Sequence, residues 1–175
     1  LDEPHDEIVI TVTGTVETEE VEGASASDRG RLSPLVYLPP TPLTIADAAL
    51  REFARRHASA TPDRDSVLQL AGAVREAMDY VPGVTAVSDT AAQAFSLGRG
   101  VCQDHAQVMI ASCRAVGVPA RYVSGYLLTD RDEHIASHAW VDVWLADLSC
   151  WFAVDVTNGR AGGEGHCRLA VGRDY

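Results

Sequence analysis

The chain has 175 residues, 46% of them hydrophobic, which suits one soluble globular domain with a sizeable core. Its formal net charge is −11, but residues 1–28 hold nine acidic side chains and no basic one, so the remainder is nearly neutral. We expect neither a nucleic-acid partner nor a membrane span, because the chain has no basic stripe and no run of about 18 apolar residues.

The first 42 residues predict an extended lead-in. Residues 8–13 alternate like a strand, residues 17–30 are rich in Glu, Ser and Gly like a flexible connector, and residues 34–42 are proline-rich. Leu1 is not a start methionine, so we expect a piece of a longer protein. If one of the four cysteines is a nucleophile, a reducing and therefore cytoplasmic compartment is favoured. The sequence leaves the oligomeric state open.

Helices are expected next along the chain. Thr44, with Asp47 three residues later, predicts the start of a first helix. Apolar residues at helical spacing after Asp63 predict a second, and Thr90 and Gly98 bound a short third. Strands are then expected at residues 120–128, 138–145, 151–156 and 167–171. Helices followed by antiparallel strands predict an α+β domain.

A fourth helix is predicted from about Cys102 to Val116, because Gly117 supplies a stop. Its apolar residues share one face, which we expect to be the buried one: Cys102, Ala106, Met109, Ile110, Cys113 and Val116. The thiol of Cys102 would lie at the positive end of the helix dipole, where the thiolate is favoured. This pattern indicates a nucleophile, with a buried structural cysteine as the open alternative.

The strands at residues 138–145 and 151–156 are joined by a short polar connection, which predicts an antiparallel hairpin. If their aliphatic faces coincide, His138 and Asp155 share the opposite face. Their Cβ atoms are then directly opposed at about 5 Å or, after one step of slip, diagonal at about 7–8 Å. Either separation lets the carboxylate reach the imidazole. With Cys102, this predicts a nucleophile, a base and a residue that orients the base.

The other candidate chemistry is weaker. Cys102 and His105 lack a second pair of ligands at zinc spacing, so we expect no metal and no cofactor. His105 is expected on the surface beside the site, and Cys113 in the core. The remaining histidines are expected to be solvated: His5, His57, His134 and His166. Trp140 and Trp144 are expected to pack in the core, or else to wall a cleft. Residues 129–133 predict a solvated acidic loop or a rim of the substrate entrance.

Several motifs resemble the bacterial transglutaminase-like family. They are GVCQD at residues 100–104, GVPARYVSGY at 117–126, SHAWV at 137–141 and VDVTNG at 154–159, with further similarity in YVPGVT at 80–85 and VGRDY at 171–175. The resemblance implies a papain-like fold, with helices packed on an antiparallel sheet. It also implies a catalytic triad carried over onto Cys102, His138 and Asp155. Val156 stands where the family usually has proline.

The same resemblance divides the chain. Residues 1–42 are similar to the end of the β-rich segment that precedes the core in this family, followed by an acidic and proline-rich linker. Residues 43–175 are similar to the transglutaminase-like catalytic core, which we expect to be truncated at its C-terminus.

These features together predict acyl transfer through a thioester on a peptide or carboxamide bond of a peptide or protein substrate. Cys102 would attack the carbonyl, His138 would move the proton, and Asp155 would orient the imidazole. We expect the oxyanion near the backbone N–H of Cys102. Hydrolysis is favoured, because nothing resembles the calcium site of the large animal transglutaminases. Isopeptide formation by a transglutaminase, or a non-catalytic protein-interaction module, remains an open alternative.

Overall fold

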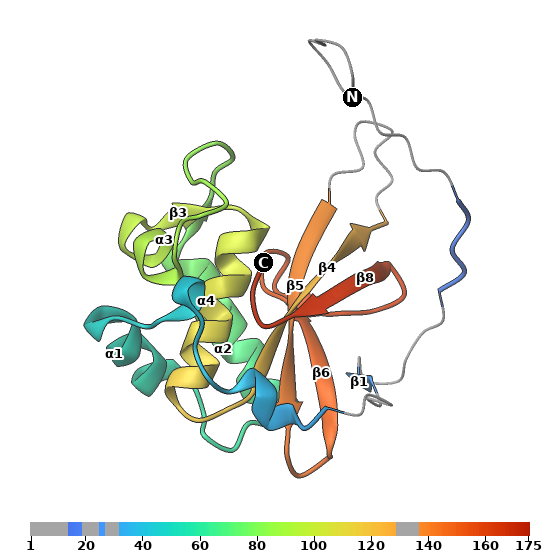
Figure 1. The fold of residues 1–175 in the computed structure, drawn as a ribbon, viewed down its shortest axis with the longest axis horizontal. Coiled ribbons are helices and arrows are strands. Elements are labelled where there is room, and N and C mark those ends of the chain that lie inside the picture. Colours follow the sequence, from blue (N-terminus) through green and yellow to red (C-terminus); the bar gives the residue numbers. More distant parts are fainter. Residues whose placement is uncertain (1–13, 19–24, 27–31, 129–136) are drawn as a thin grey trace, which may run out of the picture.

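The computed structural model describes residues 14–18, 25–26, 32–128 and 137–175 (Figure 1). The expected strand at residues 8–13 and the acidic loop at residues 129–133 lie outside these residues, as do His5 and His134. Helices form one side of the molecule and a mainly antiparallel sheet the other, which confirms the expected α+β class. In the described part of the chain, no helix combines the length and apolar character needed to cross a membrane.

The helical layer surrounds one central helix. Its elements are the 3-10 helices η2 (Pro34–Tyr37) and η3 (Pro42–Thr44), then α1 (Ala48–His57), α2 (Arg64–Ala77), α3 (Ala91–Leu97) and α4 (Cys102–Ala115). Helices α1, α2 and α3 all contact α4. On its other side α4 packs against the sheet, so it is the element that joins the two layers (Figure 1).

Side-chain caps mark the N-terminal ends of helices α1, α2 and α3. Asp63 caps α2 and Thr90 caps α3, as predicted. The prediction that α1 starts at Thr44 is wrong, because the carboxylate of Asp47 caps that helix. The hydroxyl of Thr44 is occupied elsewhere: it is buried and accepts a hydrogen bond from Arg114.

The main sheet has six strands in the described residues, and its path is β1-β6-β5-β4-β8, with β7 paired to β6. Their bounds are β1 (Ser25–Ala26), β4 (Ala120–Leu127), β5 (Ser137–Leu145), β6 (Cys150–Asp155), β7 (Arg160–Ala161) and β8 (His166–Gly172). The four strands predicted between residues 120 and 171 are therefore all present, to within one or two residues. Two further short strands, β2 (Asp79–Tyr80) and β3 (Arg99–Gly100), pair in parallel beside the start of α4.

Helix α4 is buried on all sides rather than on one face. Every residue from Asp104 to Arg114 is buried, because α1, α2 and α3 cover one side while β4 and β5 cover the other. The prediction that His105 lies on the surface is therefore wrong, since that side chain is only 1% exposed. Cys113 is a core residue, as predicted.

Arg114, near the end of α4, is a buried guanidinium whose hydrogen-bond acceptors are all uncharged. Its Nε donates to the carbonyl of Tyr37 at 2.7 Å, and Nη1 donates to the Thr44 hydroxyl at 2.7 Å. Its Nη2 donates to the carbonyls of Ala120 at 2.9 Å and Arg173 at 2.6 Å. One side chain thus connects the segment before α1, the start of β4 and the end of the chain.

Asp142 on β5 forms a buried ion cluster with Arg121 on the neighbouring strand β4 and Arg168 on β8, the next strand beyond it. Arg121 Nε lies 2.9 Å from Asp142 Oδ2, and Arg168 Nη1 lies 2.8 Å from the same oxygen. The guanidinium of Arg121 also stacks over the Trp151 ring, 4.2 Å from its centroid. This cluster ties β4 and β8 to the middle of the sheet.

Candidate active site

The start of α4 is held in place by its own third residue. Asp104 Oδ2 accepts the Val101 N–H at 2.8 Å and the Thr85 hydroxyl at 2.7 Å. A Cβ on Gly100 would lie 2.5 Å from that oxygen, so only glycine fits there. Cys102 is the first residue of the helix and is partly exposed, so its thiol is accessible at the dipole's positive end.

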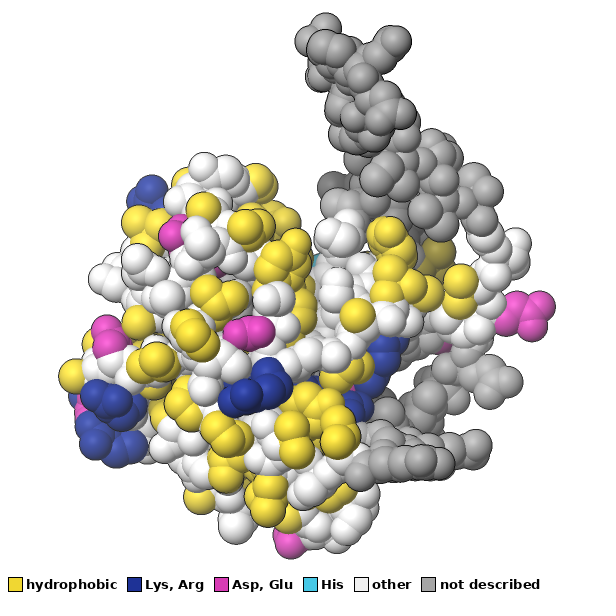
Figure 2. All heavy atoms as spheres, viewed as in Figure 1, with side chains coloured by type: hydrophobic (Ala, Val, Ile, Leu, Met, Phe, Trp, Pro, Cys, Tyr) yellow, Lys and Arg dark blue, Asp and Glu magenta, His cyan; other side chains and the backbone are white. Residues whose placement is uncertain are grey.

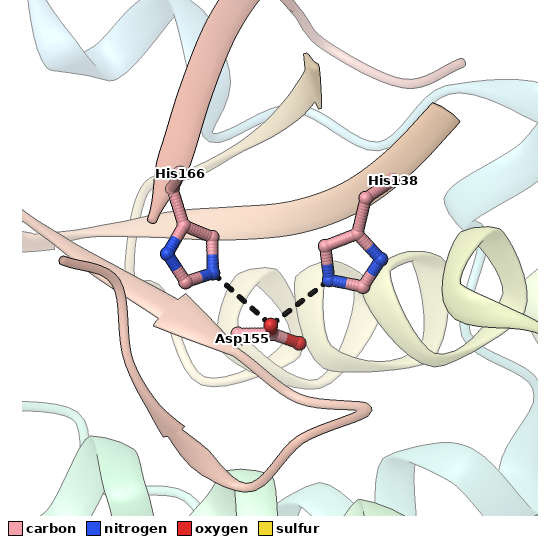
Figure 3. A group of neighbouring side chains, drawn as sticks. All are labelled: His138, Asp155 and His166. Carbon is pink, nitrogen blue, oxygen red and sulfur yellow. Dashed lines mark hydrogen bonds and ion pairs between the residues drawn. The ribbon is translucent and has the colours of Figure 1, made fainter. Parts of the chain in front are cut away.

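The hairpin of β5 and β6 brings His138 to Asp155. Val141 pairs with Val154, so the register is shifted by two residues from direct opposition of His138 and Asp155. The two residues still share a face, as the alternation predicted, and they meet diagonally. His138 Nε2 lies 2.9 Å from Asp155 Oδ2 (Figure 3). The predicted contact between imidazole and carboxylate is present.

The third residue of the predicted set, Cys102, interacts with the same imidazole. Burial alone would lower the pKa of His138, but hydrogen bonds and negative charge from Asp155 and Cys102 outweigh it and raise the pKa to about 9. Because Nε2 faces Asp155, Nδ1 is the ring nitrogen left for the thiol (Figure 3). The structure therefore brings all three predicted residues together.

Asp155 is fully buried and surrounded by donors. Besides His138, its Oδ2 is 2.7 Å from Asn158 Nδ2 and 3.1 Å from His166 Nε2, while Oδ1 accepts the Asn158 N–H at 3.1 Å. Burial would raise the pKa of Asp155, but these hydrogen bonds outweigh it and hold the pKa far below its usual range. The group is therefore a carboxylate at any working pH.

His166 is the functional-site residue that the sequence analysis placed wrongly. It was expected to be solvated, but its side chain is only 5% exposed and lies beside Asp155 (Figure 3). The Gly-rich stretch before it resembles a surface turn, and the pairing of β8 with β4 across the sheet has no local signal. Asn158 had a signal: an Asx-type turn after Asp155 is expected from an Asp followed by Asn and Gly.

His105 contributes to the packing behind the site. Its Nδ1 lies 3.1 Å from the Thr157 hydroxyl, and burial lowers the pKa of its ring. Thr157 follows Asp155 by two residues, so this contact anchors the turn after β6 to α4.

Three other ligand atoms do lie close enough together for a metal. The Nε2 atoms of His138 and His166 and an oxygen of Asp155 lie within 4.8 Å of one another. Two histidines and a carboxylate are common metal ligands. Whether such an ion fits depends on which ring nitrogen of His166 carries the proton.

The surface beside Cys102 is apolar among the described residues. Gln103 Nε2 donates to the carbonyl of Val87 at 3.1 Å, which fixes the segment between β2 and α3 against the start of α4. Tyr80, Val84 and Val87 are exposed, and Figure 2 shows hydrophobic side chains spread over this layer. Burial, followed by the negative charge of Cys102, raises the pKa of Tyr80.

Comparison with known proteins agrees with this architecture. Residues 51–156 match the model of the transglutaminase-like superfamily. An uncharacterised protein of Mycobacterium leprae is 33% identical over 186 residues, which cover 98% of this chain and 66% of that protein. An uncharacterised protein of Mycobacterium tuberculosis is 33% identical over 156 residues, covering 83% of this chain and 50% of that protein. The chain thus spans between half and two thirds of the length of these relatives.

Solved structures share the fold. A candidate cysteine protease of Cytophaga hutchinsonii superposes with a TM-score of 0.67 at 23% identity, covering 87% of this chain and 52% of that one. The periplasmic domain of TgpA from Pseudomonas aeruginosa superposes with a TM-score of 0.52 at 25% identity, covering 72% of this chain and 47% of that one. The expected papain-like arrangement of helices on an antiparallel sheet is confirmed. The chain belongs to the transglutaminase-like superfamily.

Proposed function

We propose that this chain is a cysteine-dependent acyl-transfer enzyme that acts on peptide or carboxamide bonds, with Cys102, His138 and Asp155 as its catalytic residues. One observation carries the proposal. His138 is held by Asp155 through Nε2 at 2.9 Å while its ring interacts with Cys102, the first residue of a helix. A thiol, a base and a group that orients the base are the parts that nucleophilic catalysis needs.

The first half-reaction makes a thioester. The Cys102 thiol gives its proton to Nδ1 of His138, and the sulfur forms a bond to the substrate carbonyl carbon, whose π electrons move to the oxygen. When the carbonyl re-forms, the C–N bond breaks and the leaving amine takes the proton from Nδ1. Asp155 accepts the Nε2–H bond throughout, which keeps the imidazole in the productive tautomer and stabilises its cationic form.

The second half-reaction releases the acyl group. An acceptor loses a proton to Nδ1 of His138 as its oxygen or nitrogen attacks the thioester carbon, whose π electrons move to the oxygen. When the carbonyl re-forms, the C–S bond breaks and the sulfur takes the proton back from Nδ1, which regenerates the thiol. In both halves, the negative oxygen is stabilised by the unpaired N–H groups of the first turn of α4, including that of Cys102. We propose water as the acceptor, which makes the enzyme a cysteine peptidase or amidase.

The pH dependence of iodoacetamide labelling tests the activated thiol. Labelling is mapped by peptide mass to each of the four cysteines, in the wild type and in His138→Ala. Burial raises the pKa of Cys113 to about 12, so that thiol serves as an internal unreactive control. We expect Cys102 to label fastest below pH 7, where an ordinary thiol is mostly protonated, and to lose this advantage in the variant. Equal labelling of Cys102, Cys150 and Cys167 would end the proposal.

A product assay identifies the acceptor. Incubation with glutamine-containing peptides, with and without an added primary amine, separates a free carboxylate product from a new isopeptide bond. All 14 Lys or Arg positions of the chain are arginines, so these 175 residues supply no lysine acceptor. If free carboxylate still forms at millimolar amine, the result supports hydrolysis. If only amide products with the added amine form, the proposal of hydrolysis is wrong and the reaction is transamidation.

A further inference from the structure

His166 lies beside His138 above Asp155, with the two ring centroids 6.2 Å apart. Its Nε2 is 3.1 Å from Asp155 Oδ2, the same oxygen that His138 Nε2 approaches at 2.9 Å (Figure 3). His166 is the first residue of β8, whereas His138 and Asp155 come from β5 and β6. A third strand therefore sends an imidazole to the carboxylate that orients the proposed base.

The second ring nitrogen of His166 reveals where its proton lies. The backbone N–H of Gly163 points at Nδ1 of His166 across 3.1 Å. An N–H can only donate, so Nδ1 presents a lone pair and the ring proton lies on Nε2. His166 is consequently a neutral imidazole that donates from Nε2 to Asp155.

The same tautomer argues against a metal in the cluster of His138, Asp155 and His166. A metal ion would need the lone pair of His166 Nε2, which would force the proton onto Nδ1, against the Gly163 N–H. Metal-binding histidines normally donate from the ring nitrogen that faces away from the ion. His166 accepts there instead, so the three residues form a hydrogen-bond network.

Trp140 fixes both imidazoles. Its ring packs edge-on against His166 with centroids 5.1 Å apart, and lies 30° from the plane of His138 at 6.2 Å. Trp140 is fully buried, and a Cβ on Gly125 would lie 2.7 Å from its ring and 2.1 Å from the carbonyl of Cys167. The close approach of β4 therefore depends on glycine, and it holds the tryptophan against the two histidines.

We propose that His166 is a positioning residue for the acyl-transfer site: it donates from Nε2 to Asp155 and fixes the carboxylate, so that His138 keeps Nε2 on Asp155 and Nδ1 toward Cys102. This inference rests on the proposed function and adds a fourth residue to it. Among the described residues, every hydrogen-bonding partner of the Asp155 carboxylate is then a donor, from His138, His166 or Asn158. Asp155 can neither rotate nor take a proton without breaking several of these bonds.

Two substitutions separate the donor from the ring. His166→Phe keeps an aromatic ring against Trp140 but removes the donor, while His166→Gln keeps a donor but cannot titrate. We expect the rate of Cys102 alkylation at pH 6.5 to fall about ten- to hundredfold in His166→Phe, as for loss of one hydrogen bond to a charged group. Its pH profile should move toward that of a free thiol, while His166→Gln stays within about threefold of the wild type.

The outcomes distinguish this inference from the proposed function. Fast, low-pH labelling of wild-type Cys102 combined with an unchanged His166→Phe profile would overturn the positioning role alone. An equal loss of the Cys102 alkylation rate in His166→Phe and His166→Gln would also overturn the positioning role, provided that both variants unfold at the same denaturant midpoint as the wild type. If wild-type Cys102 labels no faster than Cys150 and Cys167, both proposals fall.

A measurement on the unmodified protein does not depend on the variants folding. Two-bond proton–nitrogen correlation spectra of the 15N-histidine-labelled chain distinguish a ring nitrogen that carries a proton from one that does not. We expect His166 to show a protonated Nε2 and a bare Nδ1 at pH 7. A proton on Nδ1 would overturn the inference.

Discussion

Two buried aspartates on neighbouring strands have opposite chemical surroundings. Asp142 on β5 and Asp155 on β6 are both fully buried, and each accepts hydrogen bonds from two basic side chains. The partners of Asp142 are the guanidiniums of Arg121 and Arg168, which remain charged throughout the pH range of proteins. The partners of Asp155 are imidazoles, each of which has a second ring nitrogen that can accept or donate a proton.

The difference separates a structural ion cluster from the cluster that we propose to be reactive. Around Asp142 no proton can move, and the charges hold three strands together. Around Asp155 the carboxylate is equally fixed, but His138 has a second nitrogen that faces a thiol. Burial and ion pairing alone therefore do not mark a functional site; a partner that can exchange a proton does.

The largest expected effect concerns catalysis. Asp155→Asn should lower kcat on a peptide amide substrate by roughly 10³- to 10⁴-fold, because the amide no longer enforces the tautomer of His138. Asp142→Asn is the matched control, with the same chemical change one strand away, and its folded fraction should retain kcat within about threefold. Equal losses of kcat per folded molecule in the two variants would contradict the distinction between a structural Asp142 and a catalytic Asp155.

The second effect concerns stability. Asp142→Asn removes the carboxylate that compensates two guanidiniums, so we expect a loss of about 3–5 kcal/mol in the free energy of unfolding. Urea unfolding followed by tryptophan fluorescence measures it. Arg168→Gln removes a partner whose side chain is 31% exposed, and it should cost clearly less. A larger loss of unfolding free energy in Arg168→Gln than in Asp142→Asn would contradict the expectation that the fully buried carboxylate contributes more than its partly exposed partner.

A third effect distinguishes the clusters by pH. The pKa of His138 is raised from 6.5 to about 9 in the fold, so its protonated form contributes stability below pH 6.5 and loses it as the pH rises through 9. We expect the wild-type free energy of unfolding to fall by about 3 kcal/mol over that range. The fall should be smaller in His138→Gln and unchanged in Arg168→Gln. The same slope in wild type and His138→Gln would exclude His138 as its source.

The smallest effect is expected at a third carboxylate with two basic partners. Glu52 on α1 bonds Arg55 and Arg56, as Asp142 bonds two arginines, but its side chain is 45% exposed. Its hydrogen bonds to Arg55 and Arg56 lower the pKa of Glu52, yet water screens the pairs. Glu52→Gln should leave the thermal midpoint unchanged within error. A drop comparable to that of Asp142→Asn would show that the number of partners matters more than burial.

Local patterns in the sequence predict the elements that carry the site. Alternation along residues 138–145 and 151–156 places His138 and Asp155 on one face, whatever the exact register. The spacing of apolar residues after Cys102 predicts the helix that it opens. These features depend on residues that are close together in the sequence, so the local sequence is enough to predict them.

The errors concern residues whose surroundings come from distant parts of the chain. His105 and His166 look like surface histidines by their sequence neighbours, but tertiary packing buries them. Burial of His105 follows from three helices covering α4, and that of His166 from the pairing of β8 with β4. The cap of α1 is Asp47 rather than Thr44, whose hydroxyl accepts hydrogen bonds from Thr41 and from the distant guanidinium of Arg114. None of these partners has a local signal.

The buried guanidinium of Arg114 has a consequence for cooperativity. Its acceptors lie on the segment before α1, at the start of β4 and near the end of the chain. If the segment before α1 or the C-terminal segment detached, the guanidinium of Arg114 would lose acceptors and remain buried without replacements. Detachment of one of these two segments therefore destabilises the attachment of the other. The two flanks of the core therefore form one unfolding unit with the helix that carries Cys102, and their amides should exchange with solvent together.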